Sequence, residues 1–366
     1  MKFFDLGLDE PGLRAALDEG YRRVMDRGWA ILGPELEAFE AEFAAYCGAD
    51  QAIGVGNGLD ALVLALRAAG VTPGAEVIVP AHTFAATWLA VEAVGAAVVP
   101  VEVDPESFVL TAAAIAPAIT PRTAAVIPVS LYGHPVDMAP ILELAARHRL
   151  FVLEDAAQSH GALSHGRRTG GLAHATAFSF YPTKNLGAVG DAGAVTTSDA
   201  GLAEKIRMLR NYGSRRKYLH EIAGVNSRLD ELQAAFLRAR LERLDEANTR
   251  RRERAARYSW RLAGANGLSL PAEAAWARHV YHLYVVRSPE RDALQARLAA
   301  EGIETLIHYP TACHLQPAFA HLGYRRGDFP IAEALADEVL SLPLWPGMPL
   351  EDVDRVAAAI SSGSSG

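Results

Sequence analysis

Short apolar runs alternate with stretches of helical periodicity along the first part of the chain. The runs at 51–56 and 75–80 have the length and composition of buried strands, and helical repeats follow them at 59–70 and 84–95. The other strands predicted here are 96–103, 124–130, 150–155, 175–180 and 192–197, with a helix over 141–149. Buried strands separated by helices are typical of βαβ units, so the sequence predicts an α/β fold with a largely parallel sheet. The last two strands are close enough in sequence for an antiparallel connection.

The pattern changes after residue 199. Helices are predicted over 199–211 and 230–262. The elements predicted beyond them are strands at 280–286 and 304–307 and helices at 291–302, 331–340 and 351–360. They indicate a small C-terminal α+β domain at residues 246–360, next to a large α/β domain that, with the N-terminal helices, spans residues 1–245. Residues 361–366, SSGSSG, are interpreted as a tail or a cloning remnant.

N-terminal helices are predicted within about residues 11–47, before the first strand. We expect them to pack on the smaller domain or at its junction with the larger one. Their aromatic side chains are interpreted as core or dimer contacts. These are Tyr21, Trp29, Phe39, Phe43 and Tyr46.

Composition and charge narrow the class of protein. The chain has 366 residues, is 50% hydrophobic and carries a formal net charge of −8, which does not favour nucleic-acid binding. Its densest basic cluster, at 249–258, is interpreted as a solvated helix face, with an anion-binding patch as the alternative. The two cysteines, Cys47 and Cys313, form neither a disulfide framework nor a metal-ligand spacing, which favours a reducing cytoplasm. No signal peptide or membrane-spanning run is recognisable, and no metal site is expected.

The stretch GVGNGLDAL, at 54–62, ends a strand and begins a helix at Leu59. The free N–H groups of a first helical turn bind anions, so a phosphate is expected here. Gly56, Gly58 and Ala61 also match the GxGxxA pattern of dinucleotide folds. The acidic residue that such folds carry at the end of the second strand is missing, which argues against NAD. The alternative is a tight turn without a ligand.

A carboxylate pair and a solitary lysine follow further along. Glu154 and Asp155 end the strand at 150–155, at the edge where open α/β sheets bind ligands. There Asp155 could keep a ring nitrogen protonated, or it could cap the next helix. Lys184 stands alone between two apolar strands, where a desolvated amine could form a Schiff base or an ion pair with Asp155 or Asp191. Phosphate site, aspartate and lysine together are what a pyridoxal 5′-phosphate enzyme requires.

At these residues the chain resembles the DegT-like nucleotide-sugar aminotransferases, which are pyridoxal-phosphate enzymes of fold type I. The matching stretches run in order across residues 3–350. They are GVGNGLDALVLAL, VIVPAHTFAATWLAV, VIPVSLYGHPVDM, VLEDAAQSHGA, AFSFYPTKNLGAVGDAGAVTT, LRNYGS, GVNSRLDELQAA and IHYPTACHLQPAF. GNGLDAL and SFYPTKNLGA look most similar to the subgroup that acts on dTDP-linked 3-keto-6-deoxyhexoses. The resemblance implies a mostly parallel seven-stranded sheet domain and a smaller α+β domain.

The resemblance also implies a role for each matching residue in cofactor binding. Lys184 forms the Schiff base, Asp155 pairs with the pyridine nitrogen and Gln158, one helical turn later, lies near the ring hydroxyl. Phe84 stacks on the ring. The remaining cofactor contacts are the backbone N–H groups of Gly58 and Leu59, the Ser179 hydroxyl and, on the phosphate of the other subunit, Asn226. Such a shared site implies a homodimer.

On the sugar-nucleotide side, the matching positions are Tyr181, Lys217, Tyr218, Arg228, His308, Tyr309 and His314. The 3-dehydratases of the family carry His at the position of Lys184, so the lysine indicates transamination. The implied amino donor is L-glutamate or glutamine, and the implied acceptor is a nucleotide-linked keto-deoxysugar. The chain has no recognisable match to the carboxylate-binding arginine of amino-acid aminotransferases. The alternatives are an aminotransferase for another keto sugar or a cyclitol, such as a 4-keto sugar or an inosose, and a pyridoxal-phosphate-binding regulator.

Overall fold

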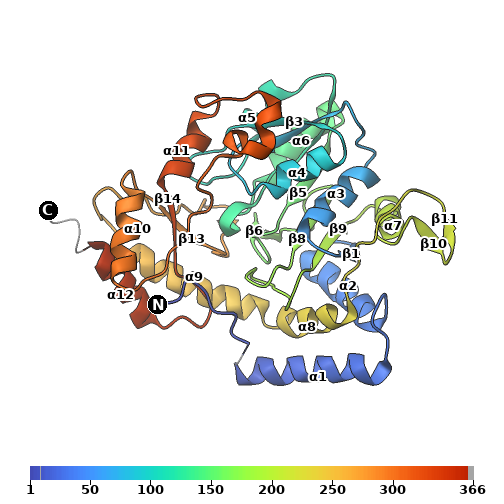
Figure 1. The fold of residues 1–366 in the computed structure, drawn as a ribbon, viewed down its shortest axis with the longest axis horizontal. Coiled ribbons are helices and arrows are strands. Elements are labelled where there is room, and N and C mark those ends of the chain that lie inside the picture. Colours follow the sequence, from blue (N-terminus) through green and yellow to red (C-terminus); the bar gives the residue numbers. More distant parts are fainter. Residues whose placement is uncertain (9, 362–366) are drawn as a thin grey trace.

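A seven-stranded sheet forms the centre of the larger part of the molecule (Figure 1). The computed structural model describes residues 1–8 and 10–361. In spatial order the strands are β1 (Gln51–Val55), β9 (Gly193–Thr197), β8 (Ala175–Ser179), β5 (Phe151–Asp155), β4 (Thr123–Val126), β2 (Glu76–Pro80) and β3 (Ala97–Val101). Only β9 runs antiparallel to its neighbours β1 and β8. This confirms the predicted α/β fold, including the antiparallel connection between the last two strands.

The two faces of the sheet bury different side chains. In β2, Val77 and Val79 pack into a core under α3 (Gly58–Ala68), α4 (Ala86–Ala93) and α7 (Ala200–Leu209). Ile78, between them, points to the opposite face, where it packs with α6 (Met138–His148). Successive side chains of a strand point to opposite faces, so an unbroken apolar run fills both cores. The strand ends are thereby left for polar residues.

The N-terminal helices α1 (Pro11–Arg27) and α2 (Pro34–Cys47) pack on α8 (Glu231–Leu241), and α2 also packs on β1 (Figure 1). Of their two expected positions, the one on the smaller domain is therefore wrong, and the one at the junction of the domains stays a prediction. Phe39 and Phe43 are buried as expected, whereas Trp29 is 58% exposed. The Glu231 carboxylate fixes the start of α2, because it accepts the backbone N–H groups of Gly33, Glu35 and Leu36 at 2.9 Å each.

The helix predicted over 230–262 is two helices, because α8 ends at Leu241 and α9 (Leu244–Arg261) begins three residues later. No Gly or Pro marks this break. The strand predicted at 280–286 begins only at Tyr284, as β13 (Tyr284–Arg287), which pairs with β14 (Val339–Leu342). The last residues of the helix predicted at 331–340 belong to β14 instead. The helix observed there, α11, is Pro330–Glu338. The strand predicted at 304–307 is a single bridge between Leu306 and Ser341.

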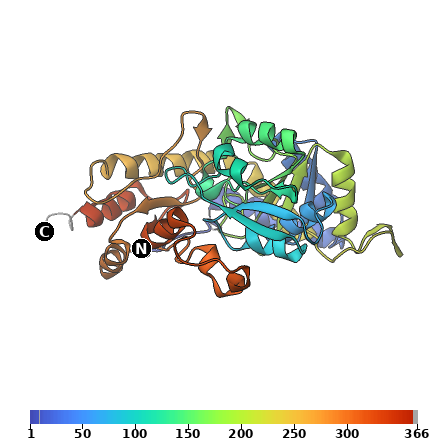
Figure 2. The same cartoon turned by 90° about the horizontal axis from the view of Figure 1, so that it is seen from above.

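A second core joins β13 and β14 to the helices α9, α10 (Arg291–Ala300) and α12 (Leu350–Ser361). In Figure 2 these elements lie at one end of the molecule, and the hairpin of β10 (Ser214–Arg216) and β11 (Leu219–His220) projects from the other. The short elements are α5 (Ala112–Ile115), β6 (Leu163–Ser164), β7 (Arg167–Arg168) and β12 (Ala277–Arg278). Ser361 ends α12, and the rest of the expected tail lies outside the described residues. None of the described helices is both long and apolar enough to span a bilayer.

Candidate active site

The predicted chemistry gathers at the carboxyl ends of the central parallel strands. β5 ends at Asp155, β8 ends five residues before Lys184, and β2 leads into the segment that carries Phe84. The N-terminus of α3 reaches the same edge, because Gly58 lies against Ser179 at the end of β8. Parallel strands present their carboxyl ends on one side of a sheet, which is where open α/β folds bind ligands.

Lys184 ends a tight turn after β8, where its backbone N–H donates to Tyr181 O at 2.8 Å. Burial lowers the pKa of its amine to about 8, and the negative charge of Asp155 partly opposes this shift. Within the described ranges the amine takes part in no ion pair, and Asp191 is exposed. The alternative of an ion pair to Asp155 or Asp191 is therefore wrong. An unpaired buried amine is available to react.

Asp155 is buried and holds its carboxylate with two hydrogen bonds. Thr87 Oγ1 donates to Oδ2 at 2.9 Å, and the N–H of Ala157 donates to Oδ1 at 3.2 Å. Burial raises the pKa of this carboxyl, while the two donors and Lys184 hold it down. The segment after Asp155 is a series of turns rather than a helix, so the alternative of a helix cap is wrong.

Glu154 points to the other face of the sheet, as strand alternation requires. It accepts the hydroxyl of Ser130 at 2.6 Å and that of Thr176 at 3.3 Å. Burial raises its pKa to about 7. Glu154 therefore lies behind the site, and Asp155 is the member of the pair that faces it.

Gln158 also sits in a turn rather than one helical turn after Asp155. Its Oε1 accepts the N–H of Tyr132 at 2.7 Å, and its Nε2 donates to the Tyr309 hydroxyl at 3.1 Å. The Tyr309 ring lies 5.3 Å from that of Phe84, which is 55% exposed. A phenylalanine exposed beside buried polar groups leaves an apolar face for a flat ring to cover.

The start of α3 forms a cradle of backbone N–H groups. Asn57 caps the helix by accepting the N–H of Asp60 at 2.8 Å, which leaves the N–H groups of Gly58 and Leu59 at its open end. A Cβ on Gly58 would lie 2.6 Å from Ser179 Cβ, so only glycine fits here. An amine, a carboxylate, an apolar ring face and an anion cradle at one sheet edge fit the aldehyde, ring nitrogen, ring and phosphate of pyridoxal 5′-phosphate.

Three residues expected on the sugar side also lie at this edge. Tyr181 is half exposed beside the turn of Lys184. The Tyr309 hydroxyl accepts a hydrogen bond from the side-chain amide of Gln158. His308 donates or accepts at Nδ1 with Ser341 Oγ, and its carbonyl accepts the Tyr132 hydroxyl. Burial and the Lys184 charge lower the pKa of His308 to about 4. His314, by contrast, is buried against Glu333 at 2.9 Å.

Four other expected residues lie on the segment 211–230. Lys217 and Tyr218 occupy the tip of the β10–β11 hairpin, where Tyr218 is 84% exposed (Figure 2). Arg228 Nη1 donates to Asn211 Oδ1 at 3.1 Å, and Asn226 is exposed beside them. Ser227, between Asn226 and Arg228, accepts the N–H of Gly56 at 3.0 Å and donates to Asp60 at 2.6 Å, so this segment reaches the start of α3 within the same chain.

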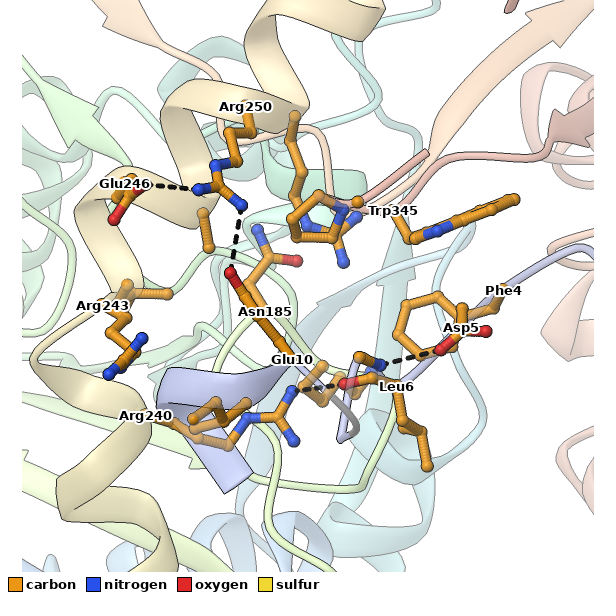
Figure 3. Close-up of a pocket in the computed structure, with 18 residues that line it drawn as sticks. Phe4, Asp5, Leu6, Glu10, Asn185, Arg240, Arg243, Glu246, Arg250 and Trp345 are labelled. Carbon is orange, nitrogen blue, oxygen red and sulfur yellow. Dashed lines mark hydrogen bonds and ion pairs between the residues drawn. The ribbon is translucent and has the colours of Figure 1, made fainter. Parts of the chain in front are cut away.

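A cavity of about 510 Å³ next to Lys184 was not predicted from the sequence (Figure 3). Its arginines include Arg250, which pairs with Glu10 and Glu246, and Arg240, which donates to the Leu6 carbonyl. Arg251 is 2% exposed and donates to three backbone carbonyls of the segments that follow α9. The interpretation of 249–258 as a solvated face is therefore wrong at Arg251, whose burial no local pattern signals.

Two further polar residues of the site escaped sequence reasoning. Thr87 contacts Asp155 directly, and the Tyr132 hydroxyl lies 2.8 Å from His82 Nε2. The signal for Thr87 was present: Thr83 and Thr87 are four residues apart in an otherwise apolar stretch. Tyr132 adopts a left-handed backbone conformation, with a φ of 57°. The glycine that follows it in the sequence does not indicate this conformation.

Comparisons with known proteins agree with this geometry. The profile of the DegT/DnrJ/EryC1/StrS aminotransferase family matches residues 13–361. The chain is 53% identical over 362 residues to the erythromycin biosynthesis sensory transduction protein EryC1 of Saccharopolyspora erythraea, covering 99% of both chains. It is 54% identical over 358 residues to the dTDP-3-amino-3,4,6-trideoxy-alpha-D-glucose transaminase of Streptomyces venezuelae, covering 98% and 94%.

Solved structures give the same result. DesV of S. venezuelae, in complex with a ketimine intermediate, has a TM-score of 0.98 at 53% identity, with 100% of this chain and 98% of that chain covered. NtdA of Bacillus subtilis, with bound cofactor PMP, has a TM-score of 0.93 at 32% identity, with 100% and 85% covered.

Proposed function

This chain belongs to the DegT/DnrJ/EryC1/StrS aminotransferase family, and from that premise we propose that it moves an amino group from L-glutamate or glutamine to the keto carbon of a nucleotide-linked keto-deoxysugar. It is a pyridoxal-phosphate-dependent sugar aminotransferase. The acceptor proposed is a dTDP-3-keto-6-deoxyhexose, because the transaminase of S. venezuelae that is 54% identical is named for a dTDP-linked 3-amino sugar. The observation that carries the proposal is the unpaired buried amine of Lys184 next to the buried carboxylate of Asp155.

Lys184, Asp155, Gln158, Phe84, Ser179 and the N-terminus of α3 would hold the cofactor. When bound, pyridoxal 5′-phosphate supplies an aldehyde that condenses with amines and a ring that accepts the electron pair of a broken C–H bond. Phe84 would cover one face of that ring. The N–H groups of Gly58 and Leu59 would neutralise the phosphate without a lysine or arginine, as helix N-termini do.

Lys184 would move the proton during the reaction. With a pKa of about 8, its Nζ atom exists in both protonation states near neutral pH, so it can take a proton from the amino donor and return it. Asp155 would keep its charge and hold a proton on the ring nitrogen of the cofactor, because an anion favours the cationic form of its partner. Gln158 presents its NH₂ group on the side away from Tyr132, since the Tyr132 N–H holds its carbonyl oxygen.

We propose a homodimer in which the segment 211–230 of one subunit completes the site of the other. Asn226 would reach the phosphate of the partner's cofactor, and Arg228, Lys217 and Tyr218 would meet the sugar nucleotide beside Tyr181, His308 and Tyr309. The exposure of Asn226, Lys217 and Tyr218 supports this arrangement. The His314–Glu333 pair would support the wall of the site from behind. The cytoplasm is the proposed compartment, since both thiols are free.

The test is the visible spectrum of the purified protein before and after L-glutamate is added without a sugar. We expect the visible band of the bound cofactor to bleach while 2-oxoglutarate appears. Lys184→Ala should abolish both the band and turnover, and Asp155→Asn should keep the cofactor but slow the reaction by orders of magnitude. A band that neither glutamate nor glutamine changes would contradict the proposal and favour a pyridoxal-phosphate-binding regulator.

A further inference from the structure

Two threonine hydroxyls form a chain of hydrogen bonds that ends at the carboxylate of Asp155. Thr83 follows β2, and Thr87 lies four residues later in the first turn of α4. Thr87 Oγ1 is 2.9 Å from Asp155 Oδ2, and Thr83 Oγ1 is 3.0 Å from Thr87 Oγ1. All three side chains are buried. The two hydrogen bonds are therefore shielded from solvent.

The direction of both hydrogen bonds follows from counting protons. An ionised carboxylate can only accept, so the single hydroxyl proton of Thr87 goes to Asp155. The oxygen of Thr87 then has only lone pairs left for Thr83, which must be the donor of the second bond. Chains of this kind polarise one another, so Thr83 strengthens the bond that Thr87 makes.

We propose that Thr87, with Thr83 behind it, is a positioning residue that holds Asp155 ionised and in a single orientation for the ring nitrogen of the cofactor. The inference rests on the proposed function, because that function requires a charged Asp155. It assigns to the stretch HTFAAT a second role besides carrying Phe84.

The need for such a donor follows from the surroundings of Asp155. Burial disfavours its charge, and no arginine pairs with it in the parts of the chain described here. The titratable groups whose charges act on it are Lys184 and Tyr309 and, from the opposite face of the sheet, Glu154. Lys184 alternates between charged and neutral forms, and a charged Glu154 would oppose the charge of Asp155. Thr87 and the N–H of Ala157 are thus its constant donors.

The two hydroxyls are held on a rigid support. The indole N–H of the buried Trp88 donates to the carbonyl of Pro80 at 2.9 Å, which ties α4 to the end of β2. The thiol of Cys313 donates to the carbonyl of Thr83 at 3.2 Å. Because the backbone on both sides of the threonines is fixed, the Thr87 hydroxyl holds Oδ2 of Asp155 in one position.

Thr87→Val tests the proposal, because it removes the hydroxyl at nearly constant shape, and Thr87→Ser is the control that restores it. The first readout is the ¹⁵N NMR shift of cofactor labelled at the ring nitrogen and bound to each holoenzyme. We expect Thr87→Val to move this signal towards that of an unprotonated nitrogen and Thr87→Ser to keep it in place. A smaller displacement in the same direction is expected for Thr83→Val.

The second readout is the acid limb of the pH profile of kcat/KM. Activity is lost as the pH falls through the pKa of Asp155, and loss of a donor to the carboxylate raises this pKa. Thr87→Val should therefore shift the acid limb up by about one pH unit, which is about tenfold in kcat/KM on that limb. Thr87→Ser should leave it unchanged.

The outcomes separate this inference from the proposed function. A wild-type protein that does not transaminate would remove the proposed function itself. An active wild type whose Thr87→Val variant keeps both the ¹⁵N shift and the acid limb would overturn the role of Thr87 alone. If the Thr87→Val variant does not fold, the Thr83→Val variant is the deciding test. An unchanged ¹⁵N signal in Thr83→Val would overturn the proposal.

Discussion

At the scale of single residues, the candidate site is marked by ionisable side chains that form no ion pair. The Lys184 side chain is partly buried and has no carboxylate partner within the described chain, while Asp155 has only neutral donors and the charge of Lys184 nearby. Glu35, by contrast, is a buried carboxylate that is paired with Arg23 and Arg238. Unpaired burial costs stability, so its occurrence at one sheet edge indicates a functional site.

The reactivity of Lys184 should depend on pH in a way that follows from its burial. A neutral amine is the nucleophile, so its rate of reaction with an amine-directed reagent rises as the pH increases through its pKa. In protein stripped of cofactor we expect the midpoint for Lys184 near pH 8, well below the ordinary value of 10.5. Peptide mapping after short labelling pulses measures this, with Lys184→Arg as the blank. A midpoint above pH 10 would contradict the lowered pKa.

At the scale of elements, the strands of the seven-stranded sheet were predictable, whereas the junctions between helices and the strand β14 were not. Apolar runs at 51–56, 75–80 and 150–155 correspond to β1, β2 and β5 within a few residues, because buried parallel strands need continuous apolar sequence. The break between α8 and α9 has no Gly or Pro and follows instead from the packing of Leu241 and Leu244 on the core. The strand β14 was hidden in a helical pattern because its pairing partner lies far along the chain.

Glu231 links two such elements, and its loss should be costly. The carboxylate is buried and accepts three backbone N–H groups at the start of α2, which would be left unsatisfied in Glu231→Ala. We expect the free energy of unfolding to fall by about 2–4 kcal/mol. Urea denaturation measures this, and Glu242→Ala, at an exposed position just after α8, is the matched control. Equal stability of the two variants would show that the cap contributes little.

At the scale of the whole molecule, the residues of the proposed site form two halves. Lys184, Asp155 and the cradle at Gly58 lie at the carboxyl edge of the sheet, and Asn226 lies on the exposed segment 211–230. A second copy is the proposed way to bring the halves together. The domain boundary predicted at residues 245 and 246 stays a prediction. It falls at the start of α9, which packs on α12 and contacts the core of the smaller part.

A mixed dimer tests the shared site. Lys184→Ala and Asn226→Ala should each be nearly inactive alone. When the two variants are refolded together, a hybrid dimer regains one complete site, in which Lys184 of one subunit meets Asn226 of the other. We expect recovery of up to about a quarter of the wild-type activity, because half of the dimers are hybrid and each has one good site. If each subunit used its own Asn226, no hybrid could recover activity.

By itself, the sequence determined the fold class and the kind of chemistry. Apolar strands, a glycine-rich helix start, an aspartate at a strand end and a solitary lysine are local features, and each depends on a few neighbouring residues. Only the tertiary structure decided what surrounds them. Thr87 meets Asp155 across 68 positions of chain, and Glu231 reaches α2 across nearly two hundred. Such contacts arise from the packing of whole elements, so no local pattern contains them, and they set the charge and orientation on which the chemistry depends.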